Sequence, residues 1–262
     1  MRIQVVTSSA IKKETLSAQY ISTMQHELTI EGTNFEDNKS VDLIHIMGKL
    51  DLALLRLIKT ANSKKIPILY SPLASIVSWQ HSPLQYALKK CHLTFHATGK
   101  HEKQYIQQHF QPHEVYLVKN PIVTNDGASS DLYKQLLELY TKVTSEHDQQ
   151  IRRQIKQQVD QFESTDHQLQ TLCNEFLYAQ YLFHRDSLNP AFAQQLADKM
   201  QTADYNEDLM GEILQKLEIY SFVASLEQAM LQTTTLTVGF IPIPAIDNRT
   251  TRKIAEMITH KN

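Results

Sequence analysis

The first 125 residues of the sequence alternate short apolar runs with longer stretches of helical periodicity. The runs are a few residues long and rich in Ile, Val and Leu, which is typical of buried strands. Each stretch between them is long enough for a helix, so consecutive strands can pair in parallel through a crossover. A parallel sheet is covered on both faces, and right-handed crossovers make it doubly wound. The sequence therefore predicts an α/β fold: a Rossmann-like parallel sheet with helices on both faces, followed by a mainly helical region.

The predicted strands can be read directly from the apolar runs. They are IQVVTS (3–8), VDLIHIMG (41–48), IPILYSP (66–72), HLTFHAT (92–98) and EVYLVKNPI (114–122), with a weaker strand in ELTIEG (27–32). We place the domain boundary near residues 124–131, where a short polar stretch contains Gly127. This gives a Rossmann-like domain over 1–125 and a mainly helical region over 126–262.

The helical region has apolar residues at three- and four-residue steps, as in amphipathic helices. Residues 206–231 are predicted to form one long helix. Threonines and prolines then predict an extended arm or late strand over 233–246, with a closing helix from about Asp247. A helical bundle of this kind could mediate contact with a protein partner or with a second copy of the chain.

Composition and charge exclude several classes of function. A formal net charge of −2 does not favour binding to nucleic acid or to an anionic membrane surface. No apolar run reaches the roughly 18 residues of a membrane span. The chain has two cysteines, Cys91 and Cys173, and no recognisable secretion signal, so we expect a cytoplasmic protein without disulfides.

His45 is the first candidate for a functional residue. It lies near the carboxyl end of the strand 41–48, and it shares one face of that strand with Leu43 and Met47. Ligands of parallel α/β sheets bind beyond the carboxyl ends of the strands, so His45 could face a ligand. The alternative is a core histidine whose ring nitrogens are satisfied inside the fold, and position alone does not decide between the two.

Several strand ends together resemble the N-terminal domain of GT-B glycosyltransferases of the glycosyltransferase 4 type. The resemblance covers about residues 1–125. Asp42, His45 and Gly48 match a D-x-x-H-x-x-G pattern, and Pro67 precedes the next strand. Thr98, Glu102 and Ile106 match an S-x-x-E-x-x-x-L-like pattern. Asn120 and Pro121 match the family at a strand end.

The resemblance implies a nucleotide sugar as donor, a carbohydrate as acceptor and no other cofactor. The chain departs from the family in three ways. TSSAIKKE (7–14) replaces the glycine-rich turn after the first strand, and YSPLAS (70–75) lacks the histidine and glycine common after the proline-led strand. No second Rossmann-like domain follows. Two hypotheses therefore stand. The chain is either a glycosyltransferase-related enzyme, or a non-catalytic glycosyltransferase-like module for binding and assembly with a partner.

The candidate site follows from these strand ends and from the chemistry of glycosyl transfer, which needs a base near the acceptor and groups that stabilise the leaving diphosphate. His45 is the candidate base. The candidate substrate-binding residues are Ser8, Ser9, His96, Lys100 and Asn120, and the candidate phosphate-binding residues are Arg249 and Arg252. Each has a structural alternative: Lys100 as a solvated residue at a helix start, Asn120 as a turn residue. The spacing of the histidines matches no zinc motif, so we predict no metal site.

Overall fold

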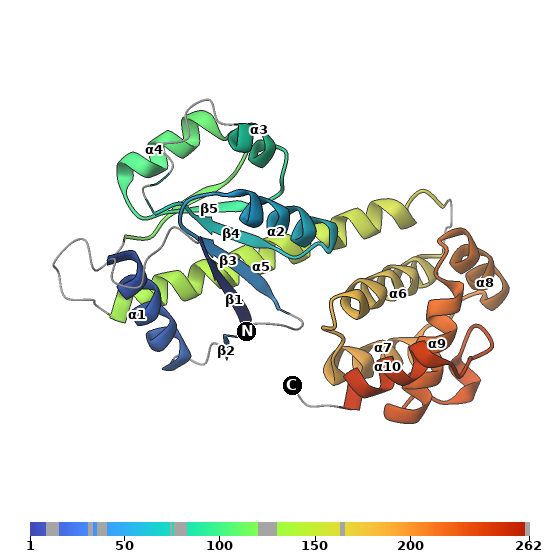
Figure 1. The fold of residues 1–262 in the computed structure, drawn as a ribbon. Coiled ribbons are helices and arrows are strands. Elements are labelled where there is room, and N and C mark those ends of the chain that lie inside the picture. The colour runs from blue at the N-terminus through green and yellow to red at the C-terminus, as the bar shows by residue number, and fades with distance from the viewer. Residues whose placement is uncertain are drawn as a thin grey trace. The chain divides into compact units, whose positions relative to one another are not determined.

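The computed structural model describes residues 1–8, 16–30, 34–35, 41–73, 75, 83–119, 130–162 and 166–259. They form two units, Met1–Asp148 and Gln149–Asn262 (Figure 1). The division falls inside helix α5 (Ser130–Val159), and therefore later in the chain than the predicted boundary. The reason is that the first part of α5 buries Leu136 and Tyr140 with the sheet, whereas its last part buries Ile155 among the other helices.

The first unit is built on a six-stranded parallel sheet with the order β2-β1-β3-β4-β5-β6. The strands are β1 (Arg2–Thr7), β2 (Asn34–Phe35), β3 (Leu43–Met47), β4 (Ile68–Ser71), β5 (Thr94–Ala97) and β6 (Val115–Leu117). The order reverses between β1 and β3, because β2 lies on one side of β1 and all later strands lie on the other. The predicted parallel α/β sheet is confirmed.

Helices cover both faces of this sheet (Figure 1). One face, which includes Leu43 and Met47, packs against α1 (Leu16–Ile30) and the first part of α5. The other face, which includes Ile44 and Phe95, packs against the remaining helices of the unit. Those are α2 (Leu52–Ser63), α3 (Pro83–Lys89) and α4 (Lys100–His109). Alternate residues of each strand therefore enter two separate cores, as expected for a doubly covered sheet.

The weak strand predicted at 27–32 is wrong over its first four residues, because α1 continues through Ile30. Ile21, Met24 and Leu28 lie three and four residues apart, and all are buried against the sheet. This helical spacing outweighs the β-branched residues at the end of the segment.

The second unit is helical. Its helices are the end of α5, α6 (His167–His184), α7 (Pro190–Thr202), α8 (Glu207–Lys216), α9 (Tyr220–Thr233) and α10 (Arg249–Thr259). Asn189 caps α7 and Pro190 occupies its first turn. No helix in the described part of the chain is long and apolar enough to cross a membrane.

The single helix predicted over 206–231 is wrong, because the structure ends α8 at Lys216 and starts α9 at Tyr220. The N–H of Ile219 donates to the carbonyl of Leu214 at 3.0 Å, and the N–H of Glu218 donates to that of Gln215 at 3.0 Å. This is the bonding of a Schellman cap, which places Glu218 in the left-handed region at φ 59°. Glycine is the usual residue at such a position. Because Glu218 takes its place, the sequence gives no signal that the helix ends here.

The segment after α9 contains a short 3-10 turn, η2 (Val238–Phe240), and otherwise runs as an arm without a described strand. Leu236 and Ile243 anchor the arm in the core of the second unit. The closing helix is confirmed, although Asn248 caps it in place of Asp247: the side-chain oxygen of Asn248 accepts from the N–H of Thr251 at 3.0 Å.

Glu227 is an exception among the buried residues of α9. Its side chain is fully buried, and neither carboxyl oxygen has a hydrogen-bond partner among the described residues. Burial raises the pKa of Glu227 from 4.5 to about 9. The phenol of Tyr205 is the titratable group nearby, since Glu227 contributes to raising the pKa of Tyr205 to about 12. The carboxyl group is therefore protonated in the folded chain at neutral pH.

We expect Glu227→Met to be more stable than the native chain at pH 8. The unfolded state ionises Glu227 near pH 4.5 and the folded state near pH 9, so the free energy of unfolding falls as pH rises through this window. The slope is about 1.4 kcal/mol per pH unit. Urea unfolding of both chains at pH 6 and pH 8 measures the difference, with exposed Glu212→Gln as the control. An equal stability change at both pH values would contradict the prediction.

Candidate functional site

Four polar side chains meet on the sheet face that lies under α5. They are His45 of β3, Ser71 of β4, His96 of β5 and Tyr140 of α5. All four are fully buried. They lie at or near the carboxyl ends of three neighbouring strands, where the fold predicts ligand-facing groups.

Short hydrogen bonds link the four side chains into one chain, the buried relay. The Nδ1 atom of His45 is 2.6 Å from the Tyr140 hydroxyl, and its Nε2 atom is 2.6 Å from the Ser71 Oγ. The same Oγ is 2.7 Å from the Nδ1 of His96. The relay ends where the Nε2 of His96 meets the carbonyl oxygen of Val118 at 3.0 Å.

The direction of each hydrogen bond follows from its last acceptor. A carbonyl oxygen only accepts, so the Nε2 of His96 carries a proton and donates to Val118. In the neutral ring, the Nδ1 of His96 then accepts from Ser71, which uses the single hydroxyl proton of that serine. The Nε2 of His45 must therefore donate to the Ser71 oxygen, and the Nδ1 of His45 accepts from Tyr140. One arrangement satisfies the whole relay, and both imidazoles are neutral in it.

Burial also favours the neutral form of both histidines. It lowers the pKa of His45 well below 6.5, and the neighbouring His96 lowers it further. Burial lowers the pKa of His96 to about 4, although the hydrogen bond to Val118 opposes the shift. Neither ring is poised to exchange a proton near neutral pH, which a general base requires.

The sequence prediction identified two members of the relay and missed two. His45 and His96 were both named as candidates, and the structure brings them together, with ring centroids 5.9 Å apart. Ser71 was missed, although it ends a predicted strand beside that of His45. Tyr140 was missed because its helix was assigned to the other domain.

Three of the described residues that carry the family resemblance, Asp42, Gly48 and Glu102, hold the fold together. The Asp42 carboxylate accepts from the N–H of Arg2 at 2.8 Å and pairs with the Arg2 guanidinium at 3.3 Å, which fixes β3 beside β1. Gly48 turns the chain at φ 101°, a region that favours glycine. Glu102 accepts from the N–H and the hydroxyl of Thr98 at 2.8 and 3.0 Å, which secures the start of α4.

The other predicted site residues lie apart from the relay or outside the described residues. The N–H of Ser8 donates to the carbonyl of Met47 at 2.9 Å, so it is not free to bind an anion. Lys100 is exposed at the first residue of α4. Ser9 and Asn120 lie outside the described residues.

Arg249 and Arg252 are exposed on α10 in the second unit, and their predicted approach to the sheet stays a prediction. Within the described ranges, no group of three His, Cys, Asp or Glu side chains is placed to hold a metal ion.

Comparison with known proteins adds no assignment to this geometry. No protein-family model, curated protein or solved structure matches the chain. The glycosyltransferase resemblance therefore rests on the sequence motifs alone.

We expect Tyr140→Phe to lower the free energy of unfolding by about 1–3 kcal/mol, because it leaves the Nδ1 of His45 buried without a donor. The ring is retained, so the loss reports the hydrogen bond more than the packing. Urea unfolding measures the change. Tyr86→Phe is the matched control, since Tyr86 is 61% exposed. Equal effects of the two substitutions would contradict the assigned role of Tyr140.

The relay also predicts a loss of stability in mild acid. Unfolded histidine titrates near pH 6.5, and both relay histidines titrate lower in the folded state, so the unfolded state binds more protons below pH 6.5. As pH falls below 6.5, each relay histidine lowers the free energy of unfolding by about 1.4 kcal/mol per pH unit until its folded pKa is reached. Nuclear magnetic resonance of the imidazoles separates this effect from that of Glu227. The rings of His45 and His96 should stay neutral from pH 7.5 to 5, and titration of either ring near pH 6.5 would refute the prediction.

Proposed function

We propose that the chain is a glycosyltransferase-like module that binds a nucleotide sugar or a carbohydrate and does not catalyse glycosyl transfer on its own. The buried relay carries this proposal. A base must reach the acceptor hydroxyl, whereas both nitrogens of His45 are bonded within the core and the ring is fully buried. The rival hypothesis, a glycosyltransferase with His45 as its base, needs that ring to be exposed.

Ligand binding is supported by the topology of the sheet. The strand order reverses between β1 and β3, and ligands of open parallel sheets bind at the carboxyl ends of strands around such a reversal. Lys100 and Lys119 are exposed just beyond β5 and β6 at this edge, and each could attract a diphosphate. Of the motif residues, Gly48 follows β3 and Thr98 follows β5 at this edge, whereas Asp42 and Pro67 precede β3 and β4 at the opposite edge.

Assembly with a partner is the second part of the proposal. The described residues form one Rossmann-like unit and one helical unit, and no second nucleotide-binding domain is among them. Catalysis would then need a donor site from outside these residues. Size-exclusion chromatography with light scattering tests whether the partner is a second copy.

We expect a panel of nucleotide sugars to raise the unfolding temperature of the full chain without release of free nucleotide. A ligand at a concentration of about 100 times its dissociation constant raises the free energy of unfolding by about 2.7 kcal/mol. Lys100→Gln should weaken the shift, and Lys103→Gln on the same helix should not. Nucleotide release that disappears in a folded His45→Asn variant would establish the enzyme instead. No shift with any nucleotide sugar or free sugar would refute ligand binding.

A further inference from the structure

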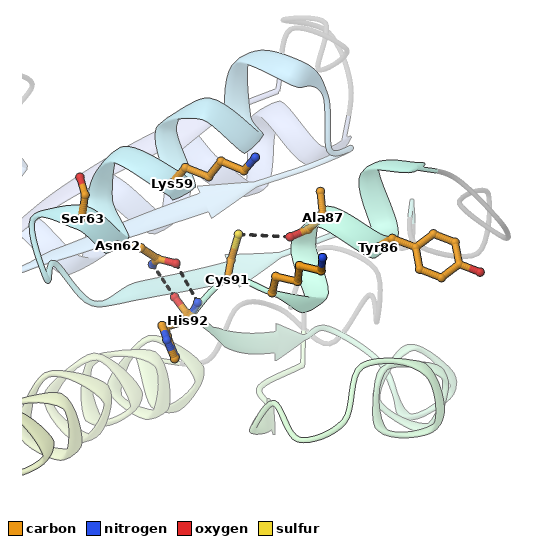
Figure 2. A pocket seen from close by; sticks show the side chains of 8 residues that line it. Lys59, Asn62, Ser63, Tyr86, Ala87, Cys91 and His92 are labelled. Atoms are coloured by element: carbon orange, nitrogen blue, oxygen red, sulfur yellow. Dashed lines mark hydrogen bonds between the residues drawn. The ribbon is translucent and has the colours of Figure 1, made fainter.

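A pocket of about 640 Å³ opens at the amino-terminal edge of the sheet, away from the carboxyl ends of the strands (Figure 2). It lies between the last turns of α2 and α3 and the segment that enters β5. Its lining is Lys59, Asn62, Ser63, Tyr86, Ala87, Lys90, Cys91 and His92. This volume is within the usual range of small-molecule sites.

The floor of the pocket is fixed by hydrogen bonds. The side chain of Asn62 donates to the carbonyl of His92 and accepts from its N–H, both at 2.7 Å (Figure 2). The Cys91 thiol donates to the carbonyl of Ala87 at 3.4 Å. These bonds join α2, α3 and the start of β5, so the pocket is held open by backbone and is preformed for a ligand.

Lysine supplies the formal charge of the pocket, which lies beside the partly negative carboxyl-terminal ends of α2 and α3. Lys59 and Lys90 line it, and no Asp or Glu does. Within the described part of the chain, neither ammonium forms an ion pair or a hydrogen bond. Their positive charge is therefore available to a ligand.

The two lysines are not needed to cap the neighbouring helices. At the end of α2, the N–H groups of Lys64, Lys65 and Ile66 already donate to the last carbonyls. At the end of α3, the N–H groups of Lys90 and Cys91 do the same. Since backbone groups satisfy these carbonyls, the ammonium groups remain free for another partner.

We propose that this pocket binds a phosphorylated small molecule, with Lys59 and Lys90 as the counter-charges to its phosphate. Lysine binds phosphate as a point charge, and the pocket presents two lysines and no carboxylate. The uncharged part of the ligand would lie against Ser63 and Ala87, with the exposed ring of Tyr86 at the rim (Figure 2). This site is separate from the carboxyl edge of the sheet and does not depend on the function proposed there.

Isothermal titration of the full chain with inorganic pyrophosphate at low salt tests the site. We expect binding that weakens at least tenfold in Lys59→Gln/Lys90→Gln. The matched control is Lys103→Gln/Lys134→Gln, which removes two lysines from α4 and α5 and should leave binding unchanged.

The proposal would be overturned by no binding of pyrophosphate, by equal weakening in both double variants, or by equally tight binding of the dicarboxylate malonate. Lys100→Gln separates the two proposed sites. If Lys100→Gln loses pyrophosphate binding and Lys59→Gln/Lys90→Gln keeps it, the anion binds at the carboxyl edge and the pocket proposal is refuted. If Lys100→Gln loses only the binding of nucleotide sugar, the pocket proposal stands.

Discussion

The hydrogen bond between Tyr140 and His45 joins residues 95 positions apart, and the arrangement of the first unit depends on it. A fully buried imidazole with an unsatisfied nitrogen would cost about 1–3 kcal/mol. Tyr140 supplies the missing donor from α5, so the first half of this helix is bound to the sheet by a specific polar contact as well as by its apolar face. The first unit consequently includes residues to Asp148, and the sheet is not complete without them.

The direction of the relay explains why two histidines at strand ends need not indicate catalysis. Each group of the relay donates its hydrogen bond to the next group, in the order Tyr140, His45, Ser71, His96 and the carbonyl oxygen of Val118. That carbonyl oxygen accepts a hydrogen bond, and it has no proton to donate to a further group. The Tyr140 hydroxyl also lies against the Met24 sulfur at 3.6 Å, inside the core. All four side chains of the relay are fully buried.

The sequence was sufficient for the parts of the structure that depend on local periodicity. The alternation of residues placed His45 and His96 on particular strand faces, and the structure confirms that they meet. Tyr140 could not be found in this way, because its partner is set by tertiary packing. The break between α8 and α9 was hidden for another reason. Glu218 occupies a left-handed position at the end of α8, where glycine would have marked the boundary.

The family-like motifs and the pocket lysines differ in how far the fold itself uses them. Asp42 and Glu102 each bond to backbone and side-chain groups beside them, so their presence follows from folding alone. A residue type that folding already requires is weak support for a shared activity. Lys59 and Lys90 have no such role among the described residues, and they keep two unpaired charges beside a preformed hollow. For this chain, unused polar groups are therefore a better guide to ligand binding than the motifs at the strand ends.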